Sequence, residues 1–343
     1  MMNLQDARKI VLRAIKNQIA CMLWGGPGIG KSSVLAQITE ELYGSKDALI
    51  DIRLPQMEPT DIRGIPKPNN DTGRTDWFYP NFWPERGPDG KCPDGPKVIL
   101  FDEIEKAPVS VKNAALQIVL DRKVGDYILP DDAAIVCAGN REDDGCFSAP
   151  MGSALNNRMI HVDVKQDIDV WAMWAHENDI EEDVIAFLLF KPEALYNNTG
   201  ENAFPSPRSW AMASKLIKGV DDTKTMKKLL GASVGEALVG EFVAWSQVYR
   251  NVKPEEVITK GNIPDFKGEE PSFRYAVAMA VAMYARKKAK KANLGNIAKF
   301  LDALPPDMRV IFLRQQKQTM LIEFAKDERF NDIVSSIMDT FDM

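Results

Sequence analysis

The stretch that most constrains this chain is GGPGIGKS, residues 25–32, which fills every fixed position of the pattern G-x-x-x-x-G-K-[ST]. Glycines lack a Cβ, so the backbone can fold closely around a polyphosphate and turn successive N–H groups toward it. Lys31 is expected to reach the β- and γ-phosphates, and the Ser32 hydroxyl is expected to coordinate Mg²⁺. The predicted phosphate-binding residues are Gly25, Gly26, Pro27, Gly28, Ile29, Gly30, Lys31, Ser32 and Ser33.

The residues on either side of this loop favour the same interpretation. The apolar run 19–24 is typical of a buried parallel strand, and residues 33–42 read as a helix. Phosphates would then lie at the positive end of that helix, where free N–H groups favour an anion. Strand, loop and helix therefore follow one another in the order that phosphate binding needs.

Two carboxylates follow a second buried strand. The apolar run 98–101 ends in Asp102 and Glu103, and the carboxyl end of a parallel strand is where α/β sheets place their ligands. An acidic pair of this kind can also be a solvated turn. Behind a phosphate loop, however, it indicates that Asp102 holds the Mg²⁺ shell and that Glu103 polarises the attacking water.

Asn140 follows the next apolar run, residues 133–138. An isolated Asn after a strand is more often a turn former. Its place behind the acidic pair favours a role at the same sheet edge, where it would orient the hydrolytic water or a γ-phosphate oxygen.

The pattern of apolar runs predicts an α/β fold with a five-stranded parallel sheet core flanked by helices, over residues 1–165. The expected strands are residues 19–24, 48–54, 98–101, 133–138 and 159–164, with helices over 3–18, from Pro108, and over 152–158. Residues 166–343 are predicted to form a C-terminal all-α lid with additional helices. Helical segments there are expected to begin at Asp169 as a cap, and at Asp183, Pro207, Thr223, Ala232, Pro271 and Pro305.

Arg208 stands out in the second part because it follows Ser206 and Pro207, which read as the N-cap and first residue of a helix. A cation in the first turn opposes the helix dipole, so it is expected to face an external anion such as a γ-phosphate. The alternative is a solvated surface arginine.

The insert at residues 55–96 is rich in Pro, Gly, Asn and Asp and is expected to be irregular. Its aromatic residues argue against disorder and either attach the insert to the core or contact a partner; they are Trp77, Phe78, Tyr79, Phe82 and Trp83. The following segment, 123–129, has the turn chemistry of a hairpin centred near Tyr127.

Composition narrows the functional class. A net charge of −6 argues against a protein that coats nucleic acid with its whole surface. Cys21 and Cys137 lie in apolar runs without metal-ligand spacing, and the N-terminus does not read as a signal peptide. No apolar run is long enough to cross a bilayer, so we expect a cytoplasmic protein. The basic run 286–291 ends an apolar helix and is expected to be solvated, with nucleic acid or an acidic partner as alternatives.

With these motifs in order, residues 5–215 resemble AAA+ ATPases, and within them the MoxR branch of the helix-2-insert clade. In the terms of that family, Walker A is residues 25–32, Walker B is 98–103, sensor 1 is Asn140, the arginine finger is Arg158 and sensor 2 is Arg208. The segment 58–66 resembles the start of the clade's insert, and the hairpin around Tyr127 resembles the one before sensor 1. Many MoxR relatives have Asp-Arg-Phe at the finger, whereas this chain has Asn157-Arg158-Met159, which leaves Arg141 as a second candidate.

The resemblance implies a Mg²⁺-dependent ATPase that hydrolyses ATP to ADP and phosphate in a ring, usually a homo-hexamer, with ATP between subunits. It also implies a chaperone-like machine that remodels a partner protein, such as one with a von Willebrand factor A domain. Two alternatives stay open at this point. One is a nucleic-acid motor or restriction-type translocase, and the other is a nucleotide-gated scaffold with little turnover, against which Glu103 and Asn140 argue.

Overall fold

The computed structural model describes residues 1–141, 157–331 and 333 of the chain. Two compact units can be distinguished. The first contains residues 1–171 together with 198–200 and 206–208, and the second contains the other residues from 172 onward.

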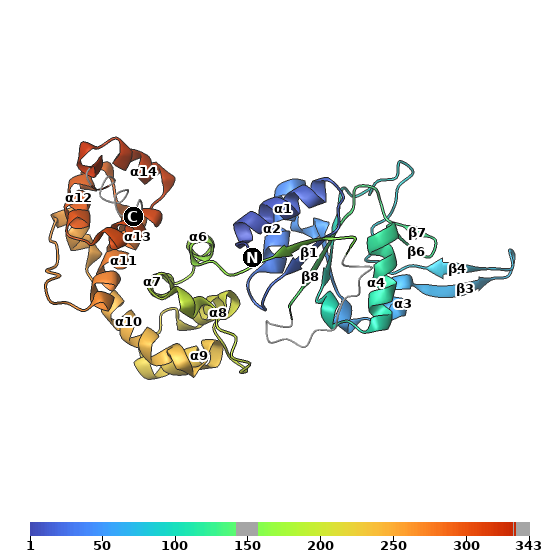
Figure 1. The fold of residues 1–343 in the computed structure, drawn as a ribbon, viewed down its shortest axis with the longest axis horizontal. Helices are drawn as coiled ribbons and strands as arrows, with labels where there is room; N and C mark the ends of the chain where they lie inside the picture. The colour runs from blue at the N-terminus through green and yellow to red at the C-terminus, as the bar shows by residue number, and fades with distance from the viewer. Residues whose placement is uncertain (142–156, 332, 334–343) are drawn as a thin grey trace. The chain divides into compact units, whose positions relative to one another are not determined.

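A five-stranded parallel sheet forms the centre of the first unit (Figure 1). Its strands are β1 (Cys21–Trp24), β2 (Leu49–Arg53), β5 (Val98–Asp102), β8 (Ala134–Gly139) and β9 (Ile160–Asp163). Their order in the sheet is β2-β5-β8-β1-β9, so β1, β5 and β8 occupy the middle and are almost completely buried. The predicted parallel α/β core is therefore confirmed, and the long apolar runs are explained by burial on both faces.

Three helices of the first unit also follow the predicted pattern. They are α1 (Leu4–Lys16), α2 (Lys31–Tyr43) and α4 (Val109–Asp121). The Asn3 side chain caps α1 by accepting a hydrogen bond from the Asp6 N–H. Pro108 is the N-cap of α4 rather than its first residue, a shift of one position. The expected helix over 152–158 lies outside the described residues except for Asn157 and Arg158, which are in a turn.

The insert is more regular than its composition predicts. It contains a short helix α3 (Pro59–Arg63) and two antiparallel strands, β3 (Ile65–Asn69) and β4 (Arg74–Phe78). Pairing of Ile65 with Phe78 at one end and of Asn69 with Arg74 at the other sets the register. We call residues 65–78 the arm, because β3 and β4 extend beyond α3 and α4 as a two-stranded ribbon (Figure 1). The expectation of an irregular insert was wrong for this segment.

The insert's aromatic residues divide into two groups. Trp83 is 5% exposed, and its indole Nε1 donates a hydrogen bond of 2.9 Å to the carbonyl of Ile62. Tyr79 and Phe82 pack against the same core, and the Tyr79 hydroxyl accepts a hydrogen bond from the Asp126 N–H at 3.0 Å. Phe78, by contrast, is 59% exposed on the arm. Most of these rings therefore attach the insert to the core, and Phe78 does not.

The predicted hairpin at 123–129 is present as β6 (Lys123–Val124) and β7 (Tyr127–Ile128). Tyr127 points into the protein rather than away from it. Its ring lies 5.8 Å from that of Trp83, and its hydroxyl donates to the carbonyl of Pro84 at 2.7 Å. Burial raises the pKa of this hydroxyl, so Tyr127 is a packed, neutral side chain.

The second unit is helical, as predicted. Its helices are α7 (Glu182–Phe190), α9 (Thr223–Val234), α10 (Val239–Asn251), α11 (Pro271–Lys288), α12 (Leu294–Asp302), α13 (Pro306–Arg314) and α14 (Gln318–Ala325), with most of α6 (Ile168–Glu177) and α8 (Pro207–Ile217). Two expected starts were wrong. The Asp167 side chain, not Asp169, accepts the N–H of Val170 in α6, and α10 begins at Val239 because Gly235 ends α9.

Buried apolar side chains and a partly buried ion pair hold this unit together. Phe187 contacts Trp210, Phe242 and Trp245 edge-on or tilted, which is the geometry that aromatic rings prefer. Asp183, 3% exposed, accepts hydrogen bonds from Ser246 Oγ at 2.6 Å and Arg250 Nε at 2.8 Å. The described helices include none with the length and apolar character of a membrane span.

The basic run 286–291 is engaged within the second unit. Arg286 donates to the carbonyl of Gln315 at 2.6 Å, Lys287 pairs with Glu182, and Lys291 pairs with Glu323 at 3.2 Å. Most of its charges therefore have partners at a solvated helix end, as expected.

Cys21 and Cys137 are buried on the neighbouring strands β1 and β8 and form no disulfide. Burial raises the pKa of the Cys21 thiol to about 12, so it is protonated at neutral pH. Both residues behave as small apolar core side chains, as predicted.

Candidate nucleotide-binding site

The loop between β1 and α2 is anchored to the sheet beside it. The Gly25 N–H donates to the carbonyl of Gly139, the last residue of β8, at 3.2 Å. Gly28 and Gly30 have φ angles of 79° and 104°, in the left-handed region that favours glycine. A Cβ on Gly28 would also come within 3.0 Å of Ser206 Oγ. The glycines therefore permit both the backbone turn and a close approach from outside the loop.

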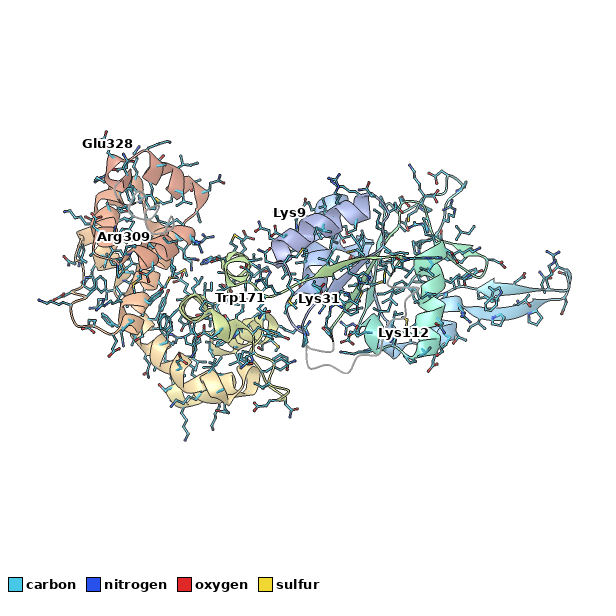
Figure 2. The ribbon with its side chains drawn as sticks, viewed as in Figure 1. Lys9, Lys31, Lys112, Trp171, Arg309 and Glu328 are labelled. Carbon is cyan, nitrogen blue, oxygen red and sulfur yellow. The ribbon has the colours of Figure 1, made fainter. Side chains whose placement is uncertain are left out.

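Lys31 is the buried cation of the site, and only 9% of it is exposed (Figure 2). Its ammonium group donates to the carbonyls of Gly25 at 2.5 Å and Gly26 at 3.1 Å, and to Asn140 Oδ1 at 2.9 Å. A buried ammonium requires such acceptors, since burial without partners is costly. The last contact joins the predicted Walker A lysine to the predicted sensor 1 across two adjacent strands.

The predicted metal ligands also lie together. Ser32 Oγ is 3.3 Å from Asp102 Oδ2, although the two residues are 70 positions apart in the chain. A hydroxyl and a carboxylate form the hard-oxygen pair that Mg²⁺ takes from proteins, with water and phosphate completing the shell. In the described residues this donor set fits Mg²⁺, with Ser32 and Asp102 as the residues that would hold it.

Glu103 adopts a backbone conformation that is uncommon for a residue with a Cβ. Its φ is 54° and its ψ is 36°, and its N–H donates to Asp102 Oδ1 at 3.0 Å. Strained residues of this kind occur where the surrounding structure must aim a functional side chain. Here Glu103 Oε1 pairs with Lys106 Nζ at 2.6 Å, within the 3₁₀ turn that follows β5.

Glu105 is a site residue that none of the sequence motifs includes. It is 1% exposed, and its Oε1 accepts hydrogen bonds from the backbone N–H of Asn140 at 3.0 Å and from Asn140 Nδ2 at 3.3 Å. Burial raises the pKa of Glu105, while the hydrogen bond from the Asn140 backbone lowers it. The signal in the sequence is a carboxylate two positions after Glu103, in a run of charged residues that reads as a solvated turn.

Arg208 lies beside the phosphate loop. Its backbone N–H donates to the carbonyl of Gly28 at 3.2 Å, and its Cβ would be 3.3 Å from a Cβ built on Gly28. The residue is exposed, and its side chain pairs with no acidic residue in the described part of the chain. These contacts place the predicted sensor 2 next to the predicted Walker A.

The two candidate arginine fingers differ in their surroundings. Arg141 pairs with Asp163, with an N–O distance of 2.6 Å, and its guanidinium lies 4.5 Å from the centre of the Trp24 ring. Arg158 is exposed in the turn before β9, and it forms no ion pair or hydrogen bond with the residues that the structure describes. Arg141 is therefore held by Asp163 and Trp24, whereas the Arg158 side chain is exposed.

Comparisons with known proteins give a similarity in sequence over part of the chain. No protein-family model matches the chain. Over 128 residues it is 33% identical to the ATP-dependent Clp protease ATP-binding subunit ClpL of Staphylococcus aureus, a match that covers 36% of this chain and 18% of ClpL. The chain thus spans less than a fifth of the length of that relative.

Solved structures give looser likenesses. The chain is similar to NtrX from Brucella abortus in complex with ADP, with 14% identity, 94% of this chain and 67% of that chain covered, and a TM-score of 0.39. It is also similar to a RuvB mutant from Thermotoga maritima, with 13% identity, coverage of 87% and 89%, and a TM-score of 0.36.

The fold and the site together define an α/β protein with a phosphate-binding loop at the carboxyl edge of a parallel sheet. Part of its sequence is similar to the ATP-binding subunit ClpL.

Proposed function

We propose that this chain is a Mg²⁺-dependent AAA+ ATPase, similar to the MoxR branch, that forms a ring and remodels a partner protein in a chaperone-like manner. The observation that carries the proposal is the contact of Lys31 Nζ with Asn140 Oδ1 at 2.9 Å, beside the Ser32–Asp102 pair at 3.3 Å. Residues from three distant segments meet there in the arrangement that phosphoryl transfer requires.

Each group has a definite task in this proposal. Lys31 binds the β- and γ-phosphates, and Ser32 and Asp102 hold Mg²⁺, which supplies neutralisation of phosphate charge when bound. Glu103 accepts the proton of the attacking water at Oε1, which requires it to leave Lys106. Arg208 orients the γ-phosphate, and Asn140 Oδ1, an acceptor, orients Lys31 and the attacking water.

The first experiment tests ATP hydrolysis itself. Lys31→Ala should abolish ATP binding, because the phosphate charge loses its partner, whereas Glu103→Gln should retain binding and lose about 10²-fold or more in turnover. Glu85→Gln is a matched control, because Glu85 is an exposed carboxylate of the insert. Normal turnover in Glu103→Gln would remove Glu103 from the role of catalytic base.

Assembly of the site from two subunits rests on Arg158. An arginine finger contributes about 10³-fold or more to hydrolysis in comparable enzymes. Arg158→Ala subunits should bind ATP but hydrolyse it poorly, and mixing them with Lys31→Ala subunits should restore activity, since one supplies the finger and the other the pocket. If mixtures of Lys31→Ala with Arg141→Ala subunits regained activity and those with Arg158→Ala subunits did not, Arg141 would be the arginine finger.

The arm is the surface that we propose contacts the partner. Ile65 is 65% exposed and pairs in register with Phe78, so two large apolar side chains lie side by side near its base. The arm carries two basic residues, Lys67 and Arg74, and two acidic ones, Asp71 and Asp76. Its formal charges therefore cancel, whereas a surface that binds phosphates carries an excess of positive charge. This composition favours a polypeptide over nucleic acid.

Tyr79 is not a partner contact in this proposal, because its hydroxyl and ring are held by Asp126 and Tyr127. Ile65→Ser with Phe78→Ser should instead leave ring assembly and basal ATPase near wild type and prevent remodelling of an unfolded model polypeptide. Tyr79→Ala is the comparison variant and should reduce stability.

The partner class is tested by stimulation of hydrolysis. We propose a protein partner, with a von Willebrand factor A domain protein as the candidate, and a homo-hexameric ring. ATPase activity should rise with the polypeptide and not with single- or double-stranded DNA or with RNA. Stimulation by nucleic acid alone would favour the motor, and absence of turnover with intact binding would favour the scaffold.

A further inference from the structure

Glu105 uses a single carboxylate oxygen to hold both N–H groups of Asn140. Oε1 accepts from the Asn140 backbone N–H at 3.0 Å and from Asn140 Nδ2 at 3.3 Å. An asparagine side chain has one acceptor end and one donor end. With its NH₂ group committed to Glu105, the Asn140 amide must direct Oδ1 to the opposite side, where Lys31 Nζ lies 2.9 Å away.

The space around this carboxylate is shaped to contain it. A Cβ on Gly139 would lie 2.3 Å from Glu105 Oε2 and 2.7 Å from the terminal methyl group of Met22, so any larger residue there would displace one or both side chains. Lys112, 5% exposed on α4, donates to the backbone carbonyl of Glu105 at 2.7 Å (Figure 2). The backbone and side chain of Glu105 are therefore both fixed from neighbouring elements.

The arrangement lowers the stability of the fold. Glu105 Oε2 is buried and has no hydrogen-bond partner among the described residues. A buried acceptor without a donor is destabilising, and a carboxylate more so than a neutral group. An apolar residue would avoid that cost but would leave the amide of Asn140 without the acceptor that orients it.

We propose that Glu105 is a positioning residue for ATP hydrolysis that acts through Asn140. It holds the amide group of Asn140 so that Oδ1 faces Lys31 Nζ in the phosphate site. The inference rests on the proposed function, since it assigns Glu105 to the same phosphate site. The burial that raises the pKa of Glu105 is consistent with a residue kept for geometry rather than for stability.

Two substitutions separate geometry from charge. Glu105→Gln keeps the length of the side chain and an acceptor oxygen, whereas Glu105→Asp keeps the charge and withdraws the oxygen by one methylene. If the hydrogen bonds to Asn140 matter, kcat falls in the order wild type, Glu105→Gln, Glu105→Asp, with about tenfold or more between the last two. The Kd of a fluorescent ATP analogue should change by less than about threefold in both. The reverse order of kcat would overturn the proposal.

A double-mutant cycle tests whether the effect passes through Asn140. Glu105→Asp combined with Asn140→Ala should have the kcat of Asn140→Ala alone, because nothing is left to position. If the double variant instead lost kcat by the product of the two single losses, Glu105 would act independently of Asn140 and the proposal would be overturned. Ile118→Val is the control for general weakening of the core, since Ile118 is a buried apolar residue of α4 in the hydrophobic core of the same unit.

Hydrogen exchange keeps this test separate from the test of the ATPase. The Asn140 backbone N–H should exchange slowly in wild type and Glu105→Gln and faster in Glu105→Asp, without any nucleotide added. If wild type shows this protection but hydrolyses no ATP, the proposed function fails and the positioning contact stands. Equal protection in all three proteins would overturn the positioning role whatever the ATPase activity.

Discussion

Trp83 provides the strongest test of how the insert is attached to the sheet. The ring is 5% exposed in the same core as Phe101 and Tyr127, and its Nε1 is bonded to the Ile62 carbonyl. Truncation of a buried Trp to Ala costs about 3–5 kcal/mol. The carbonyl left without a donor adds about 1–3 kcal/mol, so Trp83→Ala should lower the stability of the first unit by about 5 kcal/mol.

Hydrogen exchange in β5 measures that loss in the intact chain. Amides of a central strand exchange through global opening of their unit, and a tenfold change corresponds to about 1.4 kcal/mol, so β5 should exchange more than about 10³-fold faster. Trp83→Phe keeps most ring contacts and loses the hydrogen bond, so it should lie between wild type and Trp83→Ala. Phe78→Ala, on the exposed arm, should stay within about 0.5 kcal/mol. If Phe78→Ala and Trp83→Ala lowered stability equally, the distinction between aromatic residues that attach the insert and those exposed on the arm would be refuted.

Three further outcomes follow from buried polar groups. Burial raises the pKa of Glu105, so the folded state keeps a proton that the unfolded state has already lost. Wild type should therefore lose stability relative to Glu105→Gln as pH rises above about 4.3, which hydrogen exchange in β8 would measure. Burial lowers the pKa of His176, so the second unit should lose stability as pH falls below about 6.5, and His176→Gln should remove that part of the loss, measured by exchange in α13. Asp183→Ala removes the carboxylate to which Ser246 and the half-exposed Arg250 donate, and it should lower the free energy of unfolding in urea by about 3 kcal/mol. Glu241→Ala removes one member of an exposed ion pair with Lys191 and should lower it by less than about 1 kcal/mol.

The parallel core was predictable because its strands are buried on both faces. Such strands appear as short apolar runs, and the residues of the site follow the carboxyl ends of three of them. The arm was not predictable in the same way. Two of the five residues of β3 are prolines and most of β4 is exposed, so neither strand has the alternation that marks a half-buried sheet. Local pairing between the two strands defines the arm, and composition does not record pairing.

Glu105 shows where local sequence misleads. Residues 102–106 contain three carboxylates and a lysine, a composition typical of solvated turns. Glu103 and Glu105 are nevertheless different: the 3₁₀ turn buries Glu105 under β8 while the Glu103 side chain remains partly exposed. That difference depends on Gly139, a residue of another strand, and so it could not be read from the motif.

The arm also has two unlike edges. Alternate residues of an antiparallel strand turn their N–H groups to the same side, and Pro66 and Pro68, which have none, share one side of β3. Proline is tolerated in a strand where that side faces solvent, so the outer edge of β3 offers a neighbouring chain no donor between Ile65 and Asn69. The edge of β4 keeps the N–H groups of Thr75 and Trp77. An extended polypeptide could therefore add to the ribbon from the β4 side alone, and arms of neighbouring molecules are prevented from joining through β3 into a continuous sheet.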